Sequence, residues 1–182
     1  GDFILELVSG SIAPETAGKI ARLLDRVWPS QDPDYSNMAQ GIHDWVREAP
    51  SLQLLLVWKG NKLVGHTRLF QRVVKCQGQQ IALLALSSVC SHPDYRGQGI
   101  GRTLVERAFE EVNLSHYPVC IFQTEKIDFY GRLGAVEVKN TFINRLNKLD
   151  PKGNPWWDPH IMIYPEYMGW PEGEIDLNGP AF

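Results

Sequence analysis

The chain has 182 residues, 43% hydrophobic and 21% charged, a size and balance that suit one globular domain with a full core. The net charge of −3 does not favour a nucleic-acid partner, and no apolar run approaches the roughly 18 residues of a membrane span. No signal peptide is visible, and Cys76, Cys90 and Cys120 have neither metal-ligand nor disulfide-framework spacing. We therefore expect a cytoplasmic protein that binds no metal.

The N-terminal part predicts one strand followed by two helices. A strand is expected over 3–8. Pro14 suits the first turn of a helix, and apolar residues then recur at helical spacing as far as Trp28. A second amphipathic helix starts at Ser36 or Asn37 and stops before Pro50.

The middle of the chain predicts a hairpin and a parallel crossover unit. Strands over 52–58 and 63–74 are joined by Lys-Gly-Asn-Lys, a hairpin signal. The next strand runs over 81–91, an amphipathic helix follows over 100–112, and 118–122 is a short apolar strand. Strand, helix and strand in this order predict two neighbouring parallel strands.

After this unit the sequence predicts a short helix and a few short strands. The helix is expected over 125–133, and strands over 135–139 and 141–146 complete a core of 3–147. Residues 148–182 are rich in proline and aromatic residues, which argues against disorder. We expect one domain over 1–182, in which this segment is an ordered appendage with a strand near 161–164.

The residues with the clearest functional meaning are 96–101, which read Arg-Gly-Gln-Gly-Ile-Gly. A glycine loop between a strand and a helix N-terminus directs several N–H groups to one point, where the helix dipole favours an anion. Arg96 adds a formal charge there. No Gly-Lys-Ser/Thr follows, and the glycine spacing differs from the dinucleotide fingerprint. A phosphate site of another kind is predicted; the alternative is a simple tight turn.

Residues 91–105, Ser-His-Pro-Asp-Tyr-Arg-Gly-Gln-Gly-Ile-Gly-Arg-Thr-Leu-Val, closely resemble the acyl-CoA pyrophosphate loop of the GNAT superfamily of N-acetyltransferases. Residues 129–135, Phe-Tyr-Gly-Arg-Leu-Gly-Ala, are similar to the superfamily's Tyr-x-x-x-Gly-Phe segment. The resemblance covers roughly 52–147. It implies an α/β GNAT fold: a twisted mixed sheet of about six or seven strands, helices on both faces, and acetyl-CoA between two splayed central parallel strands.

The resemblance also implies roles for individual residues. Tyr130 matches the tyrosine that acts as general acid toward the CoA thiolate. No general base is assigned, because Ser87 and Ser88 stand where many members carry a glutamate. Cys90 is a possible acyl carrier, although a small buried residue is the better interpretation. The residues implied in CoA binding are Val89, Cys90, Ser91, Arg96, Gly97, Gln98, Gly99, Ile100, Gly101, Arg102 and Gln123.

The acceptor is suggested by the C-terminal segment, where 148–182 contain two lysines and six acidic residues, a balance of −4. Such a segment attracts a cation, or is simply a solvated acidic tail. Residues 170–176, Trp-Pro-Glu-Gly-Glu-Ile-Asp, resemble the C-terminus of aminoglycoside 2′-N-acetyltransferases, which implies that Glu174 and Asp176 bind the acceptor.

We therefore expect acetyl transfer from acetyl-CoA to a primary amine of a small cationic molecule, by direct attack in a ternary complex. One alternative is acetylation of a protein N-terminus or lysine, and another is a non-catalytic acyl-CoA sensor. A homodimer is compatible with the sequence.

Overall fold

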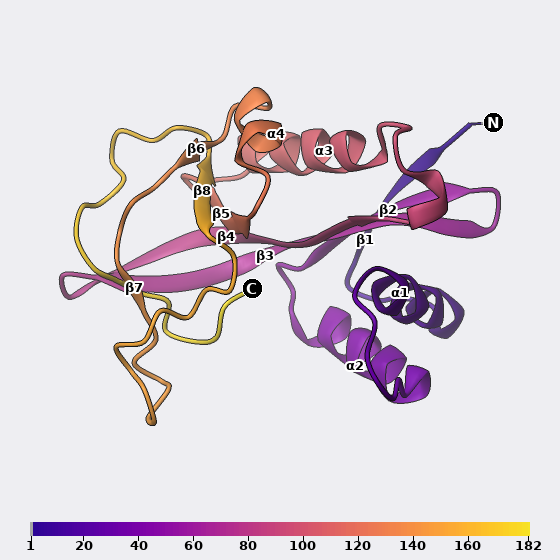
Figure 1. The fold of residues 1–182 in the computed structure, drawn as a ribbon, viewed down its shortest axis with the longest axis horizontal. Coiled ribbons are helices and arrows are strands. Elements are labelled where there is room, and N and C mark those ends of the chain that lie inside the picture. The colour runs from indigo at the N-terminus through magenta and orange to yellow at the C-terminus, as the bar shows by residue number, and fades with distance from the viewer. Residues whose placement is uncertain (1) are drawn as a thin grey trace. The chain divides into compact units, whose positions relative to one another are not determined.

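The computed structural model describes residues 2–182 and forms a mixed α/β fold, as expected (Figure 1). By contact density the chain forms two compact units: residues up to Phe70 with Ser87–Ala108, and Gln71–Leu86 with Phe109–Phe182. The elements are β1 (Ile4–Ser9), α1 (Pro14–Val27), α2 (Tyr35–Glu48), β2 (Gln53–Lys59), β3 (Lys62–Cys76), β4 (Gln79–Ser91), the 3₁₀-helix η1 (Pro93–Tyr95), α3 (Ile100–Leu114), β5 (Cys120–Thr124), α4 (Ile127–Arg132), β6 (Val136–Glu137), β7 (Phe142–Ile143), β8 (His160–Tyr164) and β9 (Ile175–Asp176).

In the first unit the strands lie in the order β1-β2-β3-β4. β1 pairs antiparallel with β2 from Ile4 opposite Trp58 to Ser9 opposite Gln53. β2 and β3 form the expected hairpin. β3 and β4 are joined by Gln77 and Gly78, which belong to the second unit and whose φ angles of 52° and 80° fit the type I′ turn that matches strand twist.

Helices cover both faces of the sheet in this unit. Alternate residues of β3 point to opposite faces, so their contacts show which helix lies on which face. A Cβ at Gly65 would lie 2.5 Å from Ile100 Cγ2, so α3 packs closely on that face. Phe70, of opposite parity, has its ring 5.2 Å from that of Trp45 in α2. Figure 1 shows α1 and α2 on one side of these strands and α3 on the other.

The second unit contains the parallel strand pair. Its strands lie in the order β3-β4-β5-β8-β6. β4 and β5 run parallel, with Leu84 opposite Cys120 and Ala85 opposite Ile121. β5 continues beyond this point and pairs antiparallel with β8 as far as Thr124, which lies opposite His160. The parallel pairing is therefore short, as a splayed pair requires.

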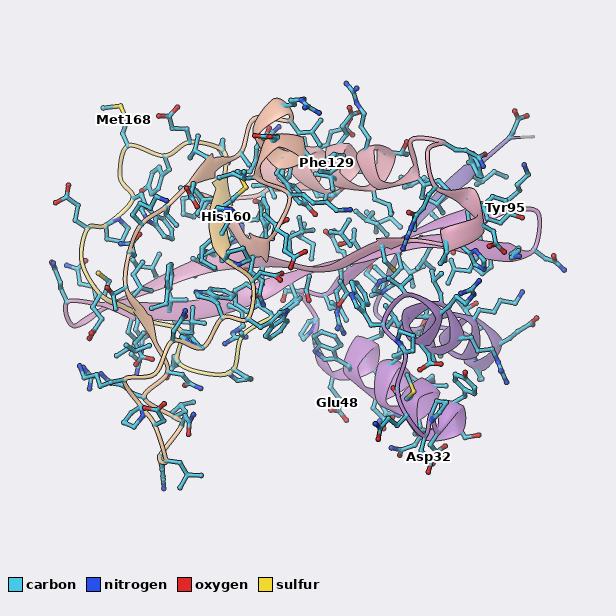
Figure 2. All side chains as sticks on the ribbon, in the orientation of Figure 1. Asp32, Glu48, Tyr95, Phe129, His160 and Met168 are labelled. Atoms are coloured by element: carbon cyan, nitrogen blue, oxygen red, sulfur yellow. The ribbon has the colours of Figure 1, made fainter. Side chains whose placement is uncertain are left out.

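The C-terminal segment adds strands to the second unit. β9 pairs parallel with β7, where Phe142 lies opposite Ile175, and antiparallel with β3, where Lys75 lies opposite Asp176. The strands expected over 135–139 and 141–146 are only two residues long each, and β9 was not expected. Trp156 is buried between Phe142 and Phe182, with ring centroids 5.5 and 5.0 Å away. Met168, in contrast, is fully exposed (Figure 2).

Candidate functional site

The glycine loop of the first unit starts from a firmly held turn at the end of β4. His92 N donates to Val64 O of β3 at 2.8 Å, and His92 Nδ1 accepts from Asp94 N at 3.1 Å. Tyr95, which ends η1 (Figure 2), packs beneath the ammonium groups of Lys59 and Lys62, 5.7 and 5.2 Å from its ring. The chain is thus fixed just before Arg96, which is exposed.

Gly97 and Gly99 give the loop its shape. Both have a φ of 79°, a conformation that side chains rarely adopt, and a Cβ on either would meet no atom within 4 Å. The space beside both residues is therefore open. Arg96, Gln98 and Arg102 are exposed around it.

The loop leads directly into the N-terminus of α3. The first helical bond runs from Thr103 N to Gly99 O at 3.0 Å, so the N–H groups of Ile100, Gly101 and Arg102 precede the helical ladder. Ile100 is buried against Gly65, which fixes the helix start on β3. The Arg102 guanidinium is paired with Glu106 at 2.5 Å. Backbone donors, the helix dipole and Arg96 together favour an anion at this place.

β4 is kinked two residues before Cys90. Ser88 has a φ of 55°, which is strained for a residue with a Cβ and costs about 1–3 kcal/mol. Neighbouring β3 residues hold it there: His66 Nδ1 donates to Ser88 O at 3.0 Å, and Thr67 Oγ1 donates to Ser87 O at 2.9 Å. The kink immediately precedes Val89, Cys90 and Ser91, whose backbone was expected to contact the acetyl-CoA arm.

The polar residues beneath the kink were missed as functional candidates. Arg68 Nη2 donates to Ser88 Oγ at 3.0 Å, and its guanidinium lies 4.2 Å from the Trp45 ring. Burial lowers the pKa of His66 to about 4, so its ring is neutral. The signal available in the sequence was an adjacent histidine, threonine and arginine within an otherwise apolar strand.

Cys90 is shut away from solvent at this kink. Burial raises the pKa of its thiol to about 12, and the nearby positive charge of Arg68 opposes this shift without overcoming it. The thiol is therefore protonated at neutral pH. Cys90 is therefore a poor nucleophile, which argues against a covalent acyl-enzyme.

Tyr130 lies in the second unit, on α4. Its ring is buried against Phe122 of β5, with centroids 4.6 Å apart, and edge-on to Phe129 (labelled in Figure 2) at 5.0 Å. Burial raises its pKa above the ordinary value for tyrosine, so the phenol is protonated at neutral pH. Within residues 2–182 its hydroxyl has no hydrogen-bond partner, which leaves it able to donate to a ligand.

Gln123, also in the second unit, uses its side chain within the protein. Oε1 accepts from the backbone N–H groups of Trp157 and Asp158 at 3.0 and 2.9 Å. Nε2 donates to Phe182 O at 2.9 Å. A contact of this amide with CoA would have to replace bonds that hold the C-terminal segment.

The two acidic residues expected at the acceptor site also have protein partners. Asp176 is buried, and its Oδ1 accepts from the backbone N–H groups of Arg145 and Asn178 at 3.1 and 2.9 Å. Glu174 forms ion pairs with Arg145 and Lys152 at 3.5 and 3.2 Å. These contacts favour a structural role for both carboxylates over binding of a cation.

Residues 2–182 lack two further kinds of functional feature. No group of three His, Cys, Asp or Glu side chains is placed to hold a metal ion. Of the helices described over this range, none has the length and apolar character needed to cross a membrane.

Comparisons with known proteins place this fold in a family. The sequence profile of the Acetyltransferase (GNAT) domain matches residues 11–137. The chain belongs to this family of acetyltransferases, which confirms the expectation from its motifs. A comparison with curated proteins gives no match.

Solved structures show the same fold at low sequence identity. A GNAT family acetyltransferase from Brucella melitensis, in complex with acetyl-CoA, matches with a TM-score of 0.61 and 14% identity, covering 95% of each chain. ElaA of Escherichia coli matches with a TM-score of 0.59 and 18% identity, over 89% of this chain and 98% of that chain. A GCN5-related N-acetyltransferase from Kribbella flavida has a TM-score of 0.60 and 19% identity, over 74% of this chain. The match spans only 33% of the Kribbella protein's length.

Proposed function

We propose that this protein transfers the acetyl group of acetyl-CoA to a primary amine of a small molecule, by direct attack within a ternary complex. The observation that carries the proposal is the loop 96–101. Two glycines in the left-handed region lead into the N-terminus of a 15-residue helix beside open space and Arg96. This arrangement suits the pyrophosphate of CoA.

The remaining steps are assigned to the backbone after the Ser88 kink and to Tyr130. The backbone that follows the Ser88 kink, at Val89, Cys90 and Ser91, pairs with the pantetheine arm and polarises the acetyl carbonyl. The amine nitrogen attacks the carbonyl carbon and loses a proton to water. The C–S bond breaks, and the CoA sulfur takes the proton of the Tyr130 hydroxyl, which then regains a proton from water. The near absence of thiolate at Cys90 supports direct transfer over a two-step route.

Binding at the loop is tested by replacing Gly99 with aspartate. The carboxylate would stand where the pyrophosphate binds, and we expect calorimetry to show at least tenfold weaker CoA binding, about 1.4 kcal/mol. Gly78→Asp is the matched control. Its φ of 80° and open surroundings copy those of Gly99, but it lies in the β3–β4 turn. Equal CoA affinity of the two variants would contradict the assignment.

The role of Tyr130 is tested by Tyr130→Phe, which keeps the ring and removes the hydroxyl. Loss of a general acid typically lowers the rate by about 10²–10⁴, and we expect a fall of that order in kcat at unchanged CoA affinity. Tyr164→Phe is the control, since that hydroxyl bonds to Asn113 instead. A kcat within twofold of wild type for Tyr130→Phe would remove this step from the mechanism.

An assay of CoA thiol release distinguishes a transferase from the alternative, a non-catalytic sensor. A transferase frees the thiol of CoA only when an acceptor amine is present, whereas a sensor binds acetyl-CoA and frees none. Peptides belong in the same screen, because acetylation of a protein N-terminus or lysine is the other alternative.

A further inference from the structure

Arg68 is a half-buried cation without an anionic partner. It lies on β3 of the first unit, stacked on Trp45 of α2. Its Nη2 donates to the neutral hydroxyl of Ser88, and its Nε is enclosed with no hydrogen-bond partner. No carboxylate of residues 2–182 lies within ion-pair distance of its guanidinium. Burial lowers its pKa to about 10, so it remains charged at neutral pH.

Its surroundings offer no substitute for a counter-ion. The Cys90 thiol is protonated, the His66 ring is neutral, and the Thr67 hydroxyl donates to a backbone carbonyl. A desolvated cation is costly unless it is paired. A ligand that carries negative charge would supply the missing partner.

Arg72, which lies further along β3, differs from Arg68 in the hydrogen-bond partners of its guanidinium. Burial lowers its pKa as well, and it too stacks on an aromatic ring, that of Phe182 at 4.9 Å. Its Nη2, however, donates to the carbonyl oxygens of Leu177 and Pro180 at 3.2 and 3.0 Å. Arg72 is thus satisfied by the protein, whereas the donors of Arg68 are largely unused.

Arg68 lies next to the part of β4 that is assigned to the acetyl group. It bonds to Ser88, the kinked residue of the strand whose following backbone is assigned to the acetyl group. At this point the chain therefore presents a guanidinium and the hydroxyls of Ser87 and Ser88. The charge offered to an acceptor at this point is positive.

We propose that Arg68 binds a carboxylate of the acceptor, so that the substrate is a small amine that also carries an acid group, as an amino acid does. This rests on the proposed acetyltransferase function. It assigns the acceptor the charge opposite to that suggested by the acidic C-terminal segment. A planar guanidinium pairs with a carboxylate through two parallel hydrogen bonds. Trp45 fixes the plane of the guanidinium, and its edge-on contact with Phe70 fixes Trp45.

The test compares free L-amino acids with the corresponding L-amino acid amides, which differ only in the charge of one group. Release of the CoA thiol gives kcat/KM for each amine. The wild-type protein is expected to prefer the best free acid over its amide at least tenfold. Arg68→Met keeps the length of the side chain and should bring this ratio near one, while Arg68→Lys should retain part of it. Arg72→Met should leave the ratio unchanged.

Because the ratio is taken within one protein sample, partial unfolding of a variant does not alter it. The proposal is overturned if wild type acetylates amides or polyamines as well as acids, or if Arg68→Met keeps the wild-type ratio. An equal loss of kcat for every amine would instead assign Arg68 to the acetyl group.

A binding measurement separates this proposal from the transferase function itself. With CoA in place of acetyl-CoA, free amino acids should raise the melting temperature of wild type more than their amides do, and this difference should vanish in Arg68→Met. If no amine releases thiol but this difference is present, the transferase function fails and the acid site stands. If neither assay distinguishes acid from amide, the acid site is disproved.

Discussion

The kink at Ser88 depends on single residues of β3, and His66 is the one whose contribution varies with pH. The residue is 1% exposed, and its Nδ1 carries the hydrogen that bonds to Ser88 O. A carbonyl only accepts, so this tautomer is required. Burial lowers the pKa of His66 to about 4 from 6.5. The unfolded chain therefore binds a proton between these pH values that the folded chain does not.

This difference predicts a loss of stability as the pH falls from about 6.5 toward 4. With the folded pKa below the unfolded one, the full contribution is present above pH 6.5. A shift of this size corresponds to about 3 kcal/mol at its limit. His66→Gln keeps a donor and does not titrate, so its free energy of unfolding should fall less between pH 7 and 5 than that of wild type. Denaturant titrations at both pH values measure this, and parallel losses in the two proteins would contradict it.

At the scale of elements, the packing of α3 on β3 positions the glycine loop. Gly65 lets the helix approach so closely that a Cβ there would lie 2.5 Å from Ile100 Cγ2, 3.1 Å from Leu104 Cδ1 and 3.2 Å from Val57 Cβ. Isoleucine is branched at Cβ and has little freedom to turn away. The first residue of the helix, and with it the loop, is therefore held by this contact.

Gly65→Ala is expected to push Ile100, at the start of α3, away from β3. Overpacking of a core typically costs about 1–3 kcal/mol, and displacement of Ile100 should also weaken CoA binding. Gly41→Ala is the control of opposite sign. Gly41 lies on α2 with nothing near its Cβ position, so alanine there should stabilise the protein through helix propensity. Thermal unfolding and calorimetry of both variants measure the effects. A Gly65→Ala protein as stable as wild type would contradict the close packing.

These two examples show what sequence patterns predict well and what they miss. Periodicity placed the first helix at 14–28, against 14–27 in the structure, and the glycine spacing predicted the loop between β4 and α3. The positive φ at Ser88 and the contacts of Arg68 depend on partners about 20 residues away in the chain, and no local period reports them. β9 was missed for the same reason, since two residues carry no alternation.

At the scale of the whole chain, the C-terminal segment belongs to the second unit and is bound into it by a few side chains. Gln123 on β5 bonds to residues 157, 158 and 182, and Arg72 on β3 bonds to residues 177 and 180. Both side chains reach partners more than 30 residues away in the sequence. These hydrogen bonds therefore hold the segment within this unit.

Gln123→Leu should separate the structural role of this residue from a role in CoA binding. Leucine has a similar size but makes none of the three hydrogen bonds, each worth about 1 kcal/mol. We expect a clear fall in melting temperature with unchanged CoA affinity. Gln40→Leu, which removes an exposed amide of α2, is the control. Weaker CoA binding at unchanged stability would restore Gln123 to the CoA site.

Because all three cysteines are buried, their reaction with an alkylating reagent would reveal local unfolding. Cys76, Cys90 and Cys120 are free and at most 6% exposed, and burial raises the pKa of Cys90 and Cys120 to about 12. Cys90 belongs to the first unit and the other two to the second. Alkylation followed by mass spectrometry would therefore time the exposure of each unit separately. In the native state these thiols are expected to remain silent toward thiol reagents, so a colorimetric assay counts only the CoA that the reaction sets free.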